Sequence, residues 1–181
     1  MRIAVLGAGA WGTALAIAFS RNHDVVLWSR ESSEIASLRQ DGENRRYLPG
    51  IALPSGLQFS DDLDVAAQAD LHLVVTPLAG LRRLSVQHRV TDAEEVALQT
   101  ARQPPERHVG PGVGAEHSRT GNAIAMGLQG PEAGTAKLPH QIVEEELGAD
   151  APCGVLTGPS FAAEVAQGLP AAVTIAARDI A

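Results

Sequence analysis

The chain is poor in several features that define common protein classes. Cys153 is its only cysteine, which excludes an internal disulfide framework and fits a reducing compartment. No apolar stretch reaches the ~20 residues that are needed to span a bilayer. Lys and Arg number 14 against 21 Asp and Glu, and the net charge of −7 argues against a nucleic-acid-binding surface. We therefore expect a cytoplasmic chain with no membrane insertion and no nucleic-acid partner.

Apolar residues, in contrast, are plentiful and occur in short runs. Hydrophobic residues make up 45% of the 181 positions, which is enough for one globular domain. Continuous apolar runs bounded by polar residues are typical of strands that are buried on both faces of a parallel sheet. Strands that alternate with helices predict an α/β fold, a Rossmann-type parallel sheet with flanking helices. The predicted strands are 3–6, 25–28, 71–75, 154–156 and 172–176, and the predicted helices are 13–21, 138–147 and 160–167.

Residues 84–130 break this alternation. The segment is rich in Arg, His, Gln, Gly and Pro, and it contains the strong breakers Gln103-Pro-Pro105 and Gly110-Pro-Gly-Val-Gly114. A stretch of this length without clear structure is unusual inside a compact domain. We therefore treat residues 1–181 as one domain with an atypical or disordered segment at 84–130.

A glycine-rich turn supplies the first functional signal. Gly7-Ala-Gly9-Ala-Trp-Gly12 matches the pattern G-x-G-x-x-G, directly after a predicted strand and at the start of a predicted helix. In that context Gly7 permits a tight turn, Gly9 the close approach of a pyrophosphate, and Gly12 close packing of helix on strand. The helix N-terminus then stabilises the diphosphate of a dinucleotide. Two alternatives are a glycine turn that binds nothing and a secretory signal over residues 3–19.

The end of the second predicted strand bears on which dinucleotide fits. An NAD site normally has an acid there that binds the ribose 2′-hydroxyl, whereas this chain has Trp28-Ser29-Arg30 and then Glu31. Arg30 is suited to a 2′-phosphate and favours NADP, while Glu31 keeps NAD open. An ordinary solvated arginine is the alternative interpretation of Arg30.

Two further runs are more distinctive than the glycine turn, Asn44-Arg-Arg-Tyr-Leu-Pro-Gly50 and Gly158-Pro-Ser-Phe-Ala162. With the glycine turn, they resemble the bacterial NAD(P)-dependent glycerol-3-phosphate dehydrogenases and are much more specific to that family. The resemblance covers residues 1 to about 83 and 131 to 181. The matching segments are 3–16, 43–51, 53–54, 74–77, 156–162, 164–165 and 168–170.

The resemblance implies hydride transfer between a nicotinamide cofactor and the glycerol-3-phosphate/dihydroxyacetone-phosphate pair, for glycerophospholipid synthesis. It is also compatible with a homodimer of the full-length family protein. By the same resemblance the cofactor, NADP or NAD, contacts Ala10, Trp11, Arg30 and Ala162, and the substrate contacts Gly158 and Ser160. Ser160 is equally well explained as a helix N-cap.

Other polar residues receive structural interpretations. Arg45 and Arg46 could hold a phosphate, but we favour a solvated or fold-stabilising role. His72 lies in an apolar strand and is expected to be a core residue, and we propose no metal.

Two departures from the family pattern bear on activity. Gln129 stands where the family has a lysine that contacts substrate and cofactor, and the 181 residues contain no counterpart of the family's helical C-terminal domain with its catalytic lysine. We therefore assign no catalytic residue and expect the chain to be inactive by itself. A shifted reading frame or a genuine surface insertion would each explain residues 84–130. The alternative functions are another two-domain reductase, for 3-hydroxy acids or ketopantoate, and a non-catalytic dinucleotide-binding module.

Overall fold

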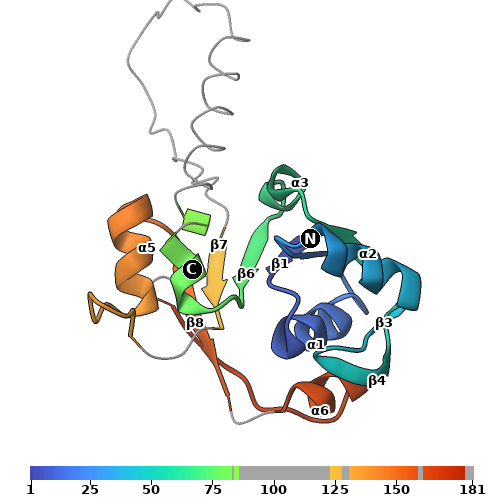
Figure 1. Ribbon diagram of the computed structural model, residues 1–181. Helices are drawn as coiled ribbons and strands as arrows, with labels where there is room; N and C mark the ends of the chain where they lie inside the picture. The colour runs from blue at the N-terminus through green and yellow to red at the C-terminus, as the bar shows by residue number, and fades with distance from the viewer. Residues whose placement is uncertain (83, 86–122, 128–130, 159–160, 178–181) are drawn as a thin grey trace, which may run out of the picture.

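The computed structural model describes residues 1–82, 84–85, 123–127, 131–158 and 161–177, and it forms a sheet flanked by helices (Figure 1). The seven strands of this sheet have the order β5-β2-β1-β6-β7-β8-β9. All neighbouring pairs are parallel except β8 and β9. The strands are β1 (Arg2–Leu6), β2 (Asp24–Trp28), β5 (Gln58–Ser60), β6 (Leu71–Val74), β7 (Ala123–Met126), β8 (Cys153–Thr157) and β9 (Thr174–Ala177).

Helices cover both faces of the sheet, as expected for a doubly wound fold. Successive residues of a strand point to opposite faces, so Ile3 and Val5 pack into one apolar cluster and Ala4 and Leu6 into another. The first cluster includes residues of α1 (Ala10–Phe19) and α2 (Ser32–Asp41). The second includes residues of α3 (Leu63–Ala67), of the helical residues 78–82 and 84–85, and of α5 (Pro139–Leu147). The predicted α/β class with a Rossmann-type sheet is confirmed.

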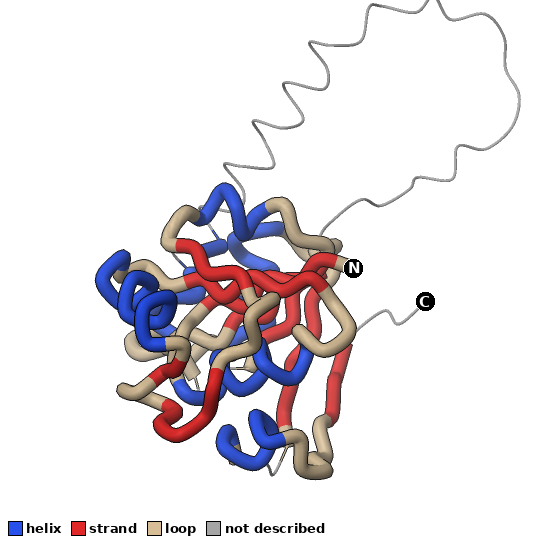
Figure 2. Tube along the Cα trace, turned by 90° about the vertical axis from the view of Figure 1, so that its right-hand side faces the viewer, coloured by secondary structure: helices blue, strands red, loops and turns tan. Residues whose placement is uncertain are grey.

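A small hairpin and a short helix complete the outer surface of α1. The hairpin pairs β3 (Glu43–Asn44) antiparallel with β4 (Leu48–Ala52), and α6 (Ala162–Gln167) lies beside α1 and β4. Leu48 and Val165 are buried against Ala14 and Ile17 of α1. Figure 2 shows the β8–β9 pair reaching from the rest of the sheet toward α6.

The strongest apolar patterns predicted the elements correctly. The five predicted strands correspond to β1, β2, β6, β8 and β9, with ends that differ by at most two residues. The secretory-signal interpretation of residues 3–19 is wrong, because they form β1, the glycine turn and α1 of the core. None of the helices in the described ranges is both long and apolar enough to cross a bilayer.

Two helix starts and one strand show how the structure differs from the predictions. The helix predicted from Thr13 begins at Ala10, because Gly9 is already its N-cap. The helix predicted from Ser160 begins at Ala162 with Phe161 as N-cap, and Ser160 lies outside the described residues. Residues 123–126, predicted to be irregular, form β7 between β6 and β8, where parallel neighbours on both sides stabilise a four-residue strand. Most of the remaining segment 84–130 lies outside the described residues.

Candidate functional site

The glycine turn lies at the carboxyl end of β1, where the strand order changes direction. From β1 the chain continues to β2 and β5 on one side, whereas β6, β7 and β8 follow on the other. In open α/β sheets ligands bind at this switch point, outside the carboxyl ends of the strands. The topology therefore places residues 7–12 where a dinucleotide binds in folds of this type.

The three glycines of the turn have different surroundings. Gly7 has a φ of +124°, which side-chain-bearing residues rarely adopt, and its N–H donates to the Trp28 carbonyl at 2.9 Å. A Cβ at Gly12 would lie 1.9 Å from the Gly7 carbonyl oxygen, so only glycine permits this close packing. A Cβ at Gly9 would have no described residue within 4 Å. The predicted tight turn at Gly7 and close packing at Gly12 are confirmed, whereas the described residues leave the space beside Gly9 open.

The start of α1 offers unsatisfied hydrogen-bond donors. Gly9 is the N-cap without a side-chain cap, and the first turn has no acidic residue. The first backbone bond of the helix runs from the Thr13 N–H to the Gly9 carbonyl at 2.9 Å. The N–H groups of residues 9–12 donate to no acceptor in the described part of the chain. Four free donors at the positive end of a helix dipole fit an anion such as a diphosphate.

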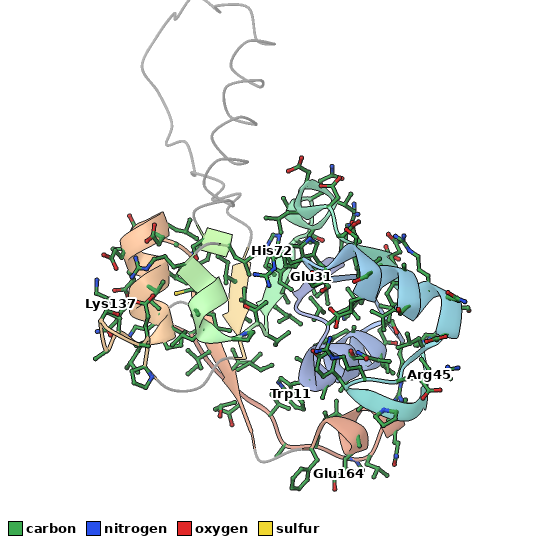
Figure 3. All side chains as sticks on the ribbon, viewed as in Figure 1. Trp11, Glu31, Arg45, His72, Lys137 and Glu164 are labelled. Atoms are coloured by element: carbon green, nitrogen blue, oxygen red, sulfur yellow. The ribbon has the colours of Figure 1, made fainter. Side chains whose placement is uncertain are left out.

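Trp11 connects this turn to the neighbouring strand ends (Figure 3). A Cβ at Gly127, the residue after β7, would lie 3.4 Å from Trp11 Nε1 and 2.8 Å from Val75 Cγ1. Thr76, after β6, has its methyl group beside Gly7, and its hydroxyl oxygen is buried without a partner among the described residues. The carboxyl ends of β1, β6 and β7 therefore meet around Trp11. Thr76 and Gly127 were not among the predicted site residues, although each lies within two residues of the end of an apolar strand.

The end of β2 carries charges of both signs. Arg30 Nη2 lies 3.2 Å from Glu31 Oε1, and the two side chains are 70% and 62% exposed. The Ser29 hydroxyl donates to the Glu34 carboxylate and accepts from the Glu31 N–H at 3.4 Å. Arg30 is thus accessible to an incoming 2′-phosphate, but Glu31 already competes for it.

The residues predicted on the nicotinamide and substrate side are only partly described. Ala162 begins α6 and packs in the cluster that joins α6 to α1. A Cβ at Gly158 would lie 2.2 Å from the Ala172 carbonyl oxygen, so the backbone packing here requires glycine. Ser160 and Gln129 lie outside the described residues.

Arg45 and Arg46 have partners within the protein. Arg45 Nη1 lies 3.7 Å from Asp41 Oδ1, and the Arg46 guanidinium lies 4.9 Å from the centre of the Tyr47 ring. Both arginines line an open cavity of about 650 Å³ between α2 and residues 43–47, which the acidic Glu31, Glu34, Asp41 and Glu43 also line. These acids make the cavity a poor phosphate site and agree with a fold-stabilising role for the two arginines.

His72 is a core residue, as predicted. It is 2% exposed, and its Nε2 lies 3.0 Å from the Ala66 carbonyl oxygen, which accepts the ring N–H.

Comparison with known proteins gives the family. The model of the "NAD-dependent glycerol-3-phosphate dehydrogenase N-terminus" matches residues 2–102 and 113–181. The chain belongs to this family. The glycerol-3-phosphate dehydrogenases [NAD(P)+] of Aromatoleum aromaticum and Dechloromonas aromatica are 52% and 44% identical to it over 180 residues, 99% of the chain in both cases. The matches cover 47% and 46% of those proteins, so the chain spans about half their length.

Solved structures agree with this assignment. The glycerol-3-phosphate dehydrogenase of Coxiella burnetii matches 98% of the chain and 47% of its own, with a TM-score of 0.76 and 32% identity. A pyrroline-5-carboxylate reductase from Coxiella burnetii matches 99% of the chain and 50% of its own, with a TM-score of 0.60 and 10% identity. This second likeness concerns the fold alone.

The family match changes two conclusions from the sequence. It includes residues 84–102 and 113–130, so the resemblance extends further than the predicted 1–83 and 131–181. Only residues 103–112 interrupt it. Membership also excludes the alternative of a 3-hydroxy-acid or ketopantoate reductase.

Proposed function

We propose that residues 1–181 form the nicotinamide-dinucleotide-binding domain of a glycerol-3-phosphate dehydrogenase. The observation that carries the proposal is the open space at Gly9 beside the free N–H groups of residues 9–12. These donors bind the diphosphate, and the absent side chain of Gly9 lets it come close. The ligand is NAD or NADP.

The remaining cofactor contacts are proposed from the family resemblance. Ala10 and Trp11 contact the dinucleotide at the start of α1, Arg30 binds its adenosine end, and Ala162 lies on the nicotinamide side. When bound, the cofactor supplies or accepts the hydride. The chain's own residues bind it, orient it and keep water from the strand ends around Trp11 and Val75.

The reaction proposed for the whole protein is the interconversion of glycerol-3-phosphate and dihydroxyacetone phosphate. The support is the name of the relatives, glycerol-3-phosphate dehydrogenase [NAD(P)+], and the family match. Gly158 and Ser160 are the proposed substrate contacts. A cytoplasmic location, a role in glycerophospholipid synthesis and a homodimer of the full-length protein complete the proposal.

Binding without turnover is the expected behaviour of residues 1–181. Reduction of a ketone requires an acid that delivers a proton to the developing alkoxide. The described residues around the turn, Gly7 to Gly12 with Val75, Thr76 and Gly127, include no titratable group of this kind. Loss of a positioned general acid costs about 10²–10⁴-fold in rate.

Fluorescence titration with NADH and NADPH, followed by an assay with dihydroxyacetone phosphate, tests this proposal. We expect saturable binding that inorganic pyrophosphate displaces, and no consumption of NADPH when dihydroxyacetone phosphate is added. A folded chain that binds neither dinucleotide contradicts the proposed binding domain. Substantial turnover contradicts the account of the missing acid. A non-catalytic binding module, the second candidate, would bind the dinucleotide but stay insensitive to dihydroxyacetone phosphate in a ternary-binding titration.

A further inference from the structure

One buried side-chain amide connects the β3–β4 hairpin to the glycine turn. Asn44, the last residue of β3, is 3% exposed. Its Nδ2 donates to the Ala8 carbonyl at 2.9 Å and to Thr13 Oγ1 at 2.7 Å. Its Oδ1 accepts the Tyr47 N–H at 3.2 Å. Both amide hydrogens are therefore used on the turn and the first turns of α1, while the oxygen fixes the amide to its own hairpin.

The bond to Ala8 determines the direction of a donor in the turn. The Ala8 carbonyl and the Gly9 N–H belong to one planar trans peptide, so they point to opposite sides of the chain. Because the carbonyl points to Asn44, the Gly9 N–H points away from the hairpin. That N–H has no acceptor in the described residues, and the space beside Gly9 is open.

We propose that Asn44 is a positioning residue that holds the Ala8–Gly9 peptide so that the Gly9 N–H faces the diphosphate of the dinucleotide. This inference rests on the proposed function. Asn44 acts through the turn and does not contact the ligand, since it is buried and both of its donors are used. Without it the Ala8 carbonyl keeps only the 3.4 Å bond from the Thr13 hydroxyl, and the peptide can rotate.

The affinities of Asn44→Ala for NADH and for inorganic pyrophosphate test the inference. NADH affinity and the competition constant of inorganic pyrophosphate should weaken by the same factor, about tenfold or more, because one charge-assisted donor to the phosphates is misdirected. Val143→Ala is the control, since Val143 is also buried but lies in α5, on the other face of the sheet from α1 and the hairpin. It should lower the melting temperature and leave both affinities within about twofold of wild type.

A second variant keeps the test valid if the alanine variant does not fold. Asn44→Asp retains the shape and the acceptor for the Tyr47 N–H, but it loses both donors and puts an oxygen against the Ala8 carbonyl. Its affinities should fall at least as far as those of Asn44→Ala. Unchanged affinities in a folded Asn44 variant, or equal losses in Val143→Ala, would overturn the positioning role. Failure of the wild-type chain to bind NADH would instead overturn the proposed function, and the inference with it.

Discussion

Gly12 is the glycine of the turn at which a side chain would be most crowded. At Gly12 a Cβ would lie 1.9 Å from a backbone oxygen of the turn, whereas at Gly56, outside the site, it would meet nothing within 4 Å. We expect Gly12→Ala to lower the free energy of unfolding by about 1–3 kcal/mol or more, because backbone must move. Gly56→Ala should be nearly neutral in the same denaturant titration. Equal stability of the two variants would contradict the close packing of α1 on β1.

Arg30 is the residue that bears most directly on cofactor selectivity. A charge-assisted bond to a 2′-phosphate contributes about 1.5–3 kcal/mol, and the exposure of Arg30 favours the lower end. Arg30→Ala should therefore weaken the affinity for NADPH about tenfold and leave the affinity for NADH nearly unchanged.

Glu31→Gln removes the carboxylate that competes for Arg30. It should raise the affinity for NADPH relative to the affinity for NADH.

The control for this selectivity is Arg45→Ala. Arg45 is similarly exposed, at 67%, and pairs with Asp41 instead of lying at the end of β2. It should change the two affinities equally or not at all. Parallel losses of NADH and NADPH in Arg30→Ala would mean that Arg30 only supports the fold.

At this scale the sequence predicted the glycine turn well, because G-x-G-x-x-G after a strand encodes its own geometry. It did not reveal the positions of Asn44, Thr76 and Gly127 beside the turn. Their roles depend on contacts with Ala8, Gly7 and Trp11 that only the folded sheet creates.

Among the elements, Arg82 links the helical residues 78–82 to α5 and to the turn before it. Its guanidinium contacts Glu132 at 3.0 Å, Glu145 at 3.0 Å and also Glu146. Arg82 lowers the pKa of Glu132, and Lys137 together with Arg82 lowers the pKa of Glu145. A carboxyl whose folded pKa is lowered stabilises the protein above its unfolded pKa and loses this contribution as pH falls through the folded value.

Arg82→Gln should therefore have a pH-dependent effect on thermal stability. The difference in melting temperature from wild type should be largest near neutral pH and should shrink between about pH 5 and pH 3. Arg2→Gln is the control, since the Arg2 side chain donates to Gln68 and to the Val65 carbonyl and has no carboxylate partner among the described residues. A constant difference for Arg82→Gln down to pH 3 would show that the carboxylates do not carry the effect.

Elements with long apolar runs could be predicted, and short ones could not. The hairpin was missed because β3 has two residues and β4, Leu48-Pro-Gly-Ile-Ala52, contains a proline and a glycine that usually indicate a loop. β7 was missed because its four residues stand among glycines and polar residues, and their pairing with β6 and β8 stabilises the strand.

For the whole molecule, alternation of strands and helices predicted the class of fold but not the strand order. The order matters for function, because it puts β1 and β6 side by side and so brings the glycine turn next to Val75 and Thr76. The shifted-frame explanation for residues 84–130 stays a hypothesis. The family match limits the stretch without a counterpart to residues 103–112.

The most direct test of the proposed binding domain is dinucleotide affinity in Gly9→Val. Gly9 has φ −70° and ψ −175°, an extended conformation that valine adopts, and its side chain would meet open space. Gly56→Val is the matched control, and the two variants should have similar melting temperatures. Gly9→Val should nevertheless lose most of its affinity for NADH, NADPH and pyrophosphate, because the valine side chain blocks the approach to the N–H groups. Wild-type affinity in a folded Gly9→Val chain would contradict the assignment of the turn as the cofactor site.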